Sequence, residues 1–117
     1  MATGPRALVE RYLEAMAAGD MPALLGCFTD DVILVTPDRT FRGRDEFAAE
    51  CERMLGGVFA PGTYTRWVDA LVVEGDLAVL VWRADCLGTQ VTHAVTHFLM
   101  RDGRVALVTS VVRSRPV

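Results

Sequence analysis

Apolar residues recur every three or four positions through three stretches of the chain, which is the spacing of a helix with one buried face. The first stretch covers residues 5–18, where the pattern is made by Leu8, Val9, Tyr12, Leu13 and Met16. A shorter helix is expected over residues 21–28, because Asp20 is a good N-cap and Pro22 suits a first turn. A third is expected over residues 45–55, where two glycines end the pattern.

The other apolar runs are rich in β-branched residues and bounded by turn residues, which is typical of strands. One strand is expected over residues 31–36, followed by a turn and a short strand around Phe41. Four longer strands are expected over residues 64–74, 77–87, 90–101 and 104–113. They predict an antiparallel meander and, with the preceding helices, an α+β fold that forms a single domain over residues 1–117. A long curved sheet with helices on one side encloses a cavity.

The expected strand over residues 77–87 is apolar on both faces. Ala78, Leu80, Trp82 and Ala84 alternate with Leu77, Val79 and Val81. A sheet that is apolar on both faces needs two covers, and three helices supply only one. We therefore expect a homodimer in which a second copy covers the outer face, and we place Leu80, Trp82 and Val111 on that face.

Composition narrows the partners. The chain has 117 residues, 51% of them hydrophobic, and a net charge of −3. Its twelve basic residues are all arginines and are scattered singly, so we expect no nucleic-acid partner. No apolar run approaches the roughly 20 residues of a membrane span, so we expect no membrane partner either. The absence of Lys and Asn indicates a GC-rich bacterial genome.

The cysteines and histidines predict neither disulfides nor a metal site. Three cysteines, Cys27, Cys51 and Cys86, lie far apart and are odd in number, which favours free thiols in a reducing cytoplasm. His93 and His97 are four residues apart on an expected strand, a separation of about 13 Å that one ion does not bridge. We expect no metal and no other cofactor.

Three segments resemble the nuclear transport factor 2-like superfamily, which includes ketosteroid isomerases, limonene epoxide hydrolases and polyketide cyclases. They are residues 11–36 (RYLEAMAAGDMPALLGCFTDDVILVT), residues 41–47 (FRGRDEF) and residues 102–105 (DGRV). The resemblance covers nearly the whole chain. It implies a cone-shaped, curved, mostly antiparallel sheet wrapped around three helices, a cystatin-like α+β barrel that is usually dimeric. It does not by itself imply one activity, because this fold hosts unrelated chemistries.

The resemblance to ketosteroid isomerases implies roles for three residues. Arg11-Tyr12, followed by Gly19-Asp20, is similar to the isomerase segment that carries a tyrosine donor, so Tyr12 is expected to donate into the pocket. The alternative is that Tyr12 packs in the core. Thr36 and Thr96 stand where the isomerases have a general base and a protonated aspartate. Because threonine does not take a proton from a carbon acid at neutral pH, steroid isomerisation is not implied.

The segment VWRADCL resembles the Arg-x-Asp segment of limonene epoxide hydrolases, and Arg83 and Asp85 match that pair. Ser110 stands where those enzymes have a further aspartate. Residues two apart on a strand share a face, and we expect this face to point inward together with Val79 and Val81. The alternative is a structural ion pair at the solvent-exposed end of the strand.

These residues predict a cofactor-independent acid–base enzyme of the cyclase, isomerase or dehydratase type, acting on a hydrophobic, oxygenated, polyketide-like molecule. Asp85 is its expected acid or base, Arg83 the electrostatic partner and Tyr12 the hydrogen-bond donor. The expected substrate contacts are Thr36, Thr92, Thr96, Ser110, Val81 and Val108. The alternatives are an epoxide hydrolase-like enzyme, a non-catalytic binder of small ligands and a dimerisation module.

Overall fold

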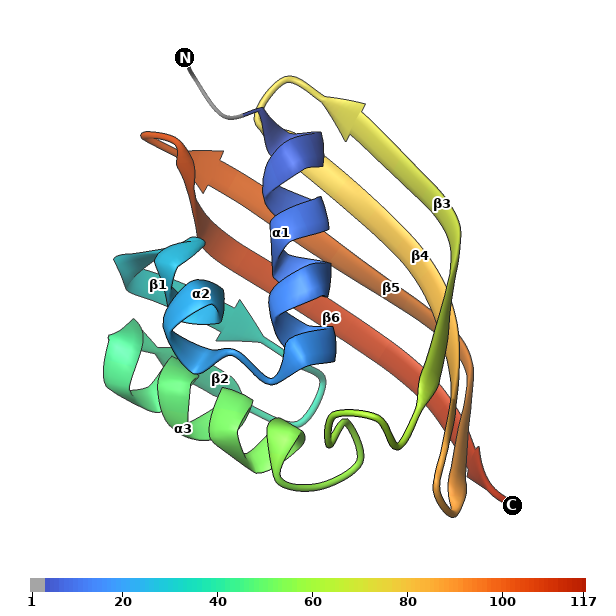
Figure 1. Ribbon diagram of the computed structural model, residues 1–117. Helices are drawn as coiled ribbons and strands as arrows, with labels where there is room; N and C mark the ends of the chain where they lie inside the picture. Colours follow the sequence, from blue (N-terminus) through green and yellow to red (C-terminus); the bar gives the residue numbers. More distant parts are fainter. Residues whose placement is uncertain (1–3) are drawn as a thin grey trace.

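The computed structural model describes residues 4–117, in which three helices lie on one side of a curved sheet (Figure 1). The helices are α1 (Pro5–Ala18), α2 (Met21–Gly26) and α3 (Gly43–Leu55). The strands are β1 (Phe28–Val35), β2 (Thr40–Arg42), β3 (Thr65–Glu74), β4 (Leu77–Cys86), β5 (Thr89–Arg101) and β6 (Arg104–Pro116). The expected α+β class and elements are confirmed, with ends that differ by up to three residues.

The six strands form one sheet in the order β2-β1-β6-β5-β4-β3. Strands β3 to β6 are the expected antiparallel meander, whereas β1 pairs in parallel with β6. The sheet is curved but not closed, since β2 and β3 are free edges, and in this respect it differs from a complete barrel. Bulges in the β3–β4 and β4–β5 pairings increase the local twist and bend these strands toward the helices.

The junction between α1 and α2 is fixed by two residues. Gly19 ends α1 with a φ of 67°, and a Cβ atom there would lie 2.5 Å from the Pro61 side chain. Asp20 then caps α2 by accepting a hydrogen bond from the Ala23 backbone N–H at 3.1 Å. This junction therefore requires glycine for both conformation and space, and it packs against the loop that leads into β3.

The core lies between the helices and the concave face of the sheet. On β4 the buried residues are Ala78, Leu80, Trp82, Ala84 and Cys86. The prediction that Leu80 and Trp82 lie on the outer face is therefore wrong, since they are 1% and 5% exposed on the helix-facing side. Period-two alternation separates the two faces without saying which one points inward, and a one-residue change of phase reverses every side chain. Val111 is 60% exposed.

Within residues 4–117 no helix is long and apolar enough to cross a membrane.

Candidate functional site

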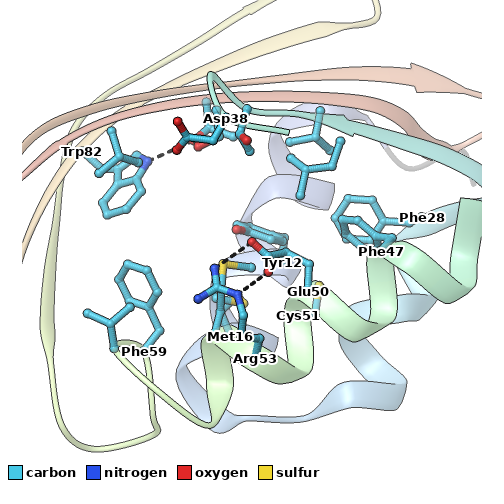
Figure 2. A pocket seen from close by; sticks show the side chains of 18 of the residues that line it. Tyr12, Met16, Phe28, Asp38, Phe47, Glu50, Cys51, Arg53, Phe59 and Trp82 are labelled. Carbon is cyan, nitrogen blue, oxygen red and sulfur yellow. Dashed lines mark hydrogen bonds and ion pairs between the residues drawn. The ribbon is translucent and has the colours of Figure 1, made fainter. Parts of the chain in front are cut away.

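A cavity of about 500 Å³ lies between the concave face of the sheet and the helices (Figure 2). Most of its wall is apolar, and aromatic rings form much of it: Phe28, Phe47, Phe59 and Trp82. Phe59 meets Trp82 edge-on with ring centres 5.9 Å apart. A cavity of this size and character suits a small apolar ligand that is oriented by a few polar groups.

Tyr12 is one of those polar groups. It extends from α1 into the cavity, and its ring is held edge-on against Phe98, with ring centres 5.1 Å apart, and against Phe28, at 6.0 Å. Burial raises the pKa of the Tyr12 phenol above its ordinary value. The phenol therefore keeps its proton at neutral pH. The ring of Tyr12 packs against core aromatic residues and the same residue lines the cavity, so a packing role and a donor role do not exclude one another.

A row of side-chain hydrogen bonds crosses β4, β5 and β6 on the cavity side. Trp82 Nε1 donates to Thr96 Oγ1 at 3.1 Å, and the hydroxyls of Thr96 and Ser110 are 3.3 Å apart. An indole N–H only donates, so Thr96 accepts from Trp82 and has its own proton for Ser110. In that arrangement Ser110, which lines the cavity, has a hydroxyl proton available for a ligand.

Asp38 lies at the tip of the turn between β1 and β2 and lines the cavity. Three hydrogen bonds close this turn. The backbone N–H and the hydroxyl of Thr36 each donate to the Arg39 carbonyl at 2.9 Å, and the Arg39 N–H donates to the Thr36 hydroxyl at 3.1 Å. Asp38 belongs to none of the ion pairs formed among residues 4–117. These hydrogen bonds fix the backbone on both sides of Asp38, an exposed residue that lines the cavity without a cationic partner among residues 4–117.

A second carboxylate in the wall is already engaged. Arg53 donates from Nε and Nη2 to the two carboxylate oxygens of Glu50, at 2.5 and 2.8 Å, one helical turn apart on α3. This pairing raises the pKa of Arg53 above its ordinary value. Of the two carboxylates that line the cavity, Asp38 is therefore the one left to accept a proton or a hydrogen bond from a ligand.

The prediction that Arg83 and Asp85 face the interior is wrong. Both lie on the outer face of β4. The alternation of β4 was assigned with the wrong phase, which also misplaced Leu80 and Trp82. Arg83 Nε donates to both carboxylate oxygens of Asp69, at 3.1 and 3.0 Å. Asp85 accepts from Gln90 Nε2 at 3.1 Å. The alternative of a structural ion pair holds for Arg83, but the partner is Asp69. Neither Arg83 nor Asp85 lines the cavity.

Four of the six expected substrate contacts do line the cavity: Thr36, Thr96, Ser110 and Val108. Val81 does not, because it shares the outer face with Arg83. Thr92 does not either: its hydroxyl donates to the Arg113 carbonyl at 3.2 Å, beside a bulge in β5. Sequence reasoning missed Asp38. The available signal was an acidic residue directly after Pro37, in the turn that follows the first strand.

The cysteines and histidines do not add a reactive group to this site. All three cysteines are free, as their number and spacing predicted, and all three are buried. Burial raises the pKa of Cys51, which lines the cavity, to about 12, so its thiol is protonated and unreactive at neutral pH. His97 lies on the outer face, where its Nδ1 is 3.0 Å from the Thr109 hydroxyl. Residues 4–117 contain no group of three His, Cys, Asp or Glu side chains placed to hold a metal ion.

Comparisons with known proteins identify the family of this chain. The family model described as "SnoaL-like domain" matches residues 9–108. A comparison with curated protein sequences gives no match.

Solved structures of three enzyme types share the fold. A provisionally assigned ketosteroid isomerase from Kribbella flavida is 19% identical, with a TM-score of 0.77 over 92% of this chain and 76% of its own. A provisionally assigned polyketide cyclase from Sinorhizobium meliloti is 20% identical, with a TM-score of 0.76 over 88% of this chain and 92% of its own. An LEH-like epoxide hydrolase from M. tuberculosis is 19% identical, with a TM-score of 0.73 over 91% of this chain and 80% of its own. At these identities the likeness establishes the fold alone.

Proposed function

The chain belongs to the SnoaL-like domain family, and we propose that it is a cofactor-independent acid–base enzyme acting on an apolar, oxygen-bearing small molecule. Proteins with this fold include isomerases, cyclases and epoxide hydrolases. One observation carries the proposal: the carboxylate of Asp38 and the phenol of Tyr12 line the same apolar cavity, and Asp38 has no cationic partner among residues 4–117. Asp38 replaces Asp85 as the acid–base group.

The two residues have complementary roles. The carboxylate of Asp38 accepts a proton, here from the carbon next to a carbonyl group of the substrate. As that C–H bond breaks, negative charge develops on the carbonyl oxygen, and the protonated phenol of Tyr12 donates a hydrogen bond to it. Ser110, at the end of the row from Trp82 through Thr96, offers a second donor or acceptor to the substrate.

The fate of the enolate decides the overall reaction. If Asp38 returns its proton to a different carbon, the reaction is an isomerisation. If the enolate carbon attacks a second carbonyl of the same molecule, the reaction is a cyclisation, and Asp38 gives its proton to the alkoxide that forms at that carbonyl. If a β-hydroxyl leaves as water with that proton, the reaction is a dehydration. The apolar wall favours a ring-bearing, polyketide-like substrate for any of these.

Exchange of carbon-bound hydrogen tests the shared first step. The protein is incubated in D₂O with 2-tetralone, an apolar bicyclic ketone, and deuterium gain is followed by mass spectrometry. The wild type should accelerate the exchange, and Asp38→Asn should lower that acceleration by about 10²- to 10⁴-fold. Asp85→Asn, the same change on the outer face, should leave it within about twofold. If Asp38→Asn exchanges as fast as the wild type, the assignment is wrong; if 2-tetralone binds without exchange, the cavity is a binding site only.

We also propose that the outer face of the sheet is a homodimer interface. Val81, Val95 and Val111 are aligned across β4, β5 and β6 on this face, and all three are partly or largely exposed. The next row is also uncharged apart from the ionisable ring of His97, which lies between Val79 and Thr109. The helices lie on the opposite side (Figure 1). A second copy presents the same uncharged surface, so an isologous pairing would cover both.

A further inference from the structure

Arg66 lies in the cavity wall among aromatic rings. It is on the helix-facing side of β3, where it pairs with the buried Ala84. The centre of its guanidinium group is 4.6 Å from the ring centre of Trp82, 5.4 Å from that of Phe59 and 5.6 Å from that of Tyr64. The three rings come from β4, the loop after α3 and the residue before β3. They hold the guanidinium by cation–π contact but accept none of its in-plane hydrogen bonds.

Arg66 also lacks the partner that other arginines of this chain have. The ion pairs formed among residues 4–117 join Arg44 to Asp30, Arg53 to Glu50, Arg83 to Asp69 and Arg101 to Asp31. Arg66 is in none of them, and its Nε is fully covered without a hydrogen-bond acceptor among the described residues. Arg83 is the most useful comparison. Its guanidinium also stacks on a ring, with the guanidinium carbon 5.1 Å from the ring centre of Trp67, but it binds the Asp69 carboxylate as well.

The missing partner is expected to be an anion. A guanidinium stays protonated in proteins, and a charge in an apolar cavity is unfavourable unless it is paired. Its planar fork of N–H groups matches the two oxygens of a carboxylate, the geometry that Arg53 uses on Glu50. Among residues 4–117 the cavity wall offers no carboxylate to Arg66, since Glu50 is engaged and Asp38 forms no ion pair. A carboxylate on a bound ligand would supply it.

We propose that Arg66 binds the carboxylate of the substrate, so that the cavity takes hydrophobic carboxylic acids. The inference rests on the proposed function and adds the charge of the substrate to it. The apolar skeleton lies among the aromatic rings of the wall, with its reacting carbon toward Asp38 and its carbonyl toward Tyr12. Arg66 and Tyr12 are within electrostatic reach of one another, because the positive charge of Arg66 lowers the pKa of the phenol against the larger raising effect of burial.

A matched pair of ligands tests the proposal on the wild-type protein. 2-Naphthoate and 2-naphthamide have the same rings and nearly the same shape, and at pH 7.5 only the first carries a charge. Titration calorimetry should give a dissociation constant at least about tenfold lower for the acid than for the amide. Equal affinities, a preference for the amide, or binding of neither ligand would overturn the inference. This comparison needs no variant and so does not depend on the folding of one.

Two variants then assign the preference to Arg66. Arg66→Gln should bind the acid and the amide equally well, with the amide affinity close to that of the wild type, which shows that the cavity is intact. Arg66→Lys keeps the charge without the fork and should retain part of the preference. Arg83→Gln is the control, a ring-stacked arginine on the outer face, and should keep the full preference. A preference that survives in Arg66→Gln would overturn the assignment.

The two proposals can fail separately. Asp38→Asn should lose hydrogen exchange on 2-tetralone while keeping its preference for 2-naphthoate, because it removes the base and leaves Arg66 in place. If the exchange depends on Asp38 but acid and amide bind equally, the acid–base function stands and the carboxylate inference fails. If the acid is preferred through Arg66 but Asp38→Asn exchanges normally, the substrate class stands and the catalytic assignment fails.

Discussion

The two faces of the sheet are built from the same strands and are both apolar, yet they differ in what covers them. On β4, Trp82 is 5% exposed on the inner face, while its neighbours Val81 and Arg83 lie on the outer face. The helices cover the inner face without filling it, and a cavity of about 500 Å³ remains. They leave the outer face open (Figure 1). The inner face therefore suits a small ligand, and the outer face a flat partner.

The polar groups on the two faces differ in the same sense. On the outer face Arg83 holds Asp69, and Gln90 joins Asp85 to Arg115, donating to the first and accepting from the second. On the inner face Asp38 and Arg66 form no ion pair with any of residues 4–117. Charge alone does not distinguish the faces, since both carry arginine and aspartate. What distinguishes the inner face is that a carboxylate and a guanidinium line one cavity without an ion-pair partner among the described residues, which is the arrangement expected of a ligand site.

Removing one hydroxyl from the cavity should slow the exchange reaction strongly. Tyr12→Phe deletes the donor and keeps the ring contacts with Phe28 and Phe98, so the exchange rate on 2-tetralone should fall about ten- to a thousandfold. The free energy of unfolding should change by about 1 kcal/mol or less. Tyr64→Phe is the control, because the Tyr64 hydroxyl is buried without a partner among residues 4–117 and its loss should not slow exchange. A fully active Tyr12→Phe would make Tyr12 a packing residue only.

Placing a charge on the outer face should break the dimer. Sedimentation of the wild type at micromolar concentration should give a dimer. Val95→Glu, at the centre of the row formed by Val81, Val95 and Val111, should raise the dissociation constant at least about a hundredfold because it buries a carboxylate in an apolar row. Val68→Glu is the matched control. Val68 is 48% exposed and pairs with Trp82, so it belongs to the inner face and should leave the dimer intact. A monomeric wild type would contradict the interface.

Alkaline titration should reveal the buried thiol on the inner side, with a smaller effect. The pKa of Cys51 is raised from 9.0 to about 12, so between these values the folded chain holds a proton that the unfolded chain has lost. The free energy of unfolding therefore falls as the pH rises through that window, by about 2 kcal/mol between pH 9 and pH 11. Tyr12 contributes in the same direction only above pH 10. Urea unfolding of Cys51→Ala should show a correspondingly shallower fall; equal slopes would contradict the burial effect.

The elements were predictable because their signals are local. The spacing of apolar residues predicts helix α1, and Gly19 marks its end. Strands β3 to β6 are separated by turn residues. Which face of a strand points inward could not be predicted in the same way. Strand β4 is apolar on both faces, so its alternation gives the period but does not say which set of side chains is buried. The tertiary contact that sets the phase comes from helices far away in the sequence. The assignment of Asp85 to the cavity failed for that reason.

The site was predictable only in part. Tyr12, Thr36, Thr96 and Ser110 line the cavity as the family resemblance implied. Asp38 was missed because the same resemblance pointed to Thr36, two residues earlier, and because its position depends on the hydrogen bonds that close the turn. The surroundings of Arg66 could not be read from the chain either. Its three rings belong to segments whose proximity exists only once β3 and β4 have paired beside the loop after α3.

The two tryptophans allow one direct test of which face holds the ligand. Trp82 is in the cavity wall, with its indole N–H donated to Thr96, and Trp67 lies on the outer face under Arg83. The ¹⁵N-labelled protein should therefore give one indole signal for each face, and Trp67→Phe assigns them. Titration with 2-tetralone should shift the Trp82 signal progressively to saturation and leave the Trp67 signal in place. A shift of Trp67 alone, or no shift of Trp82 at saturating ligand, would contradict a functional site on the inner face.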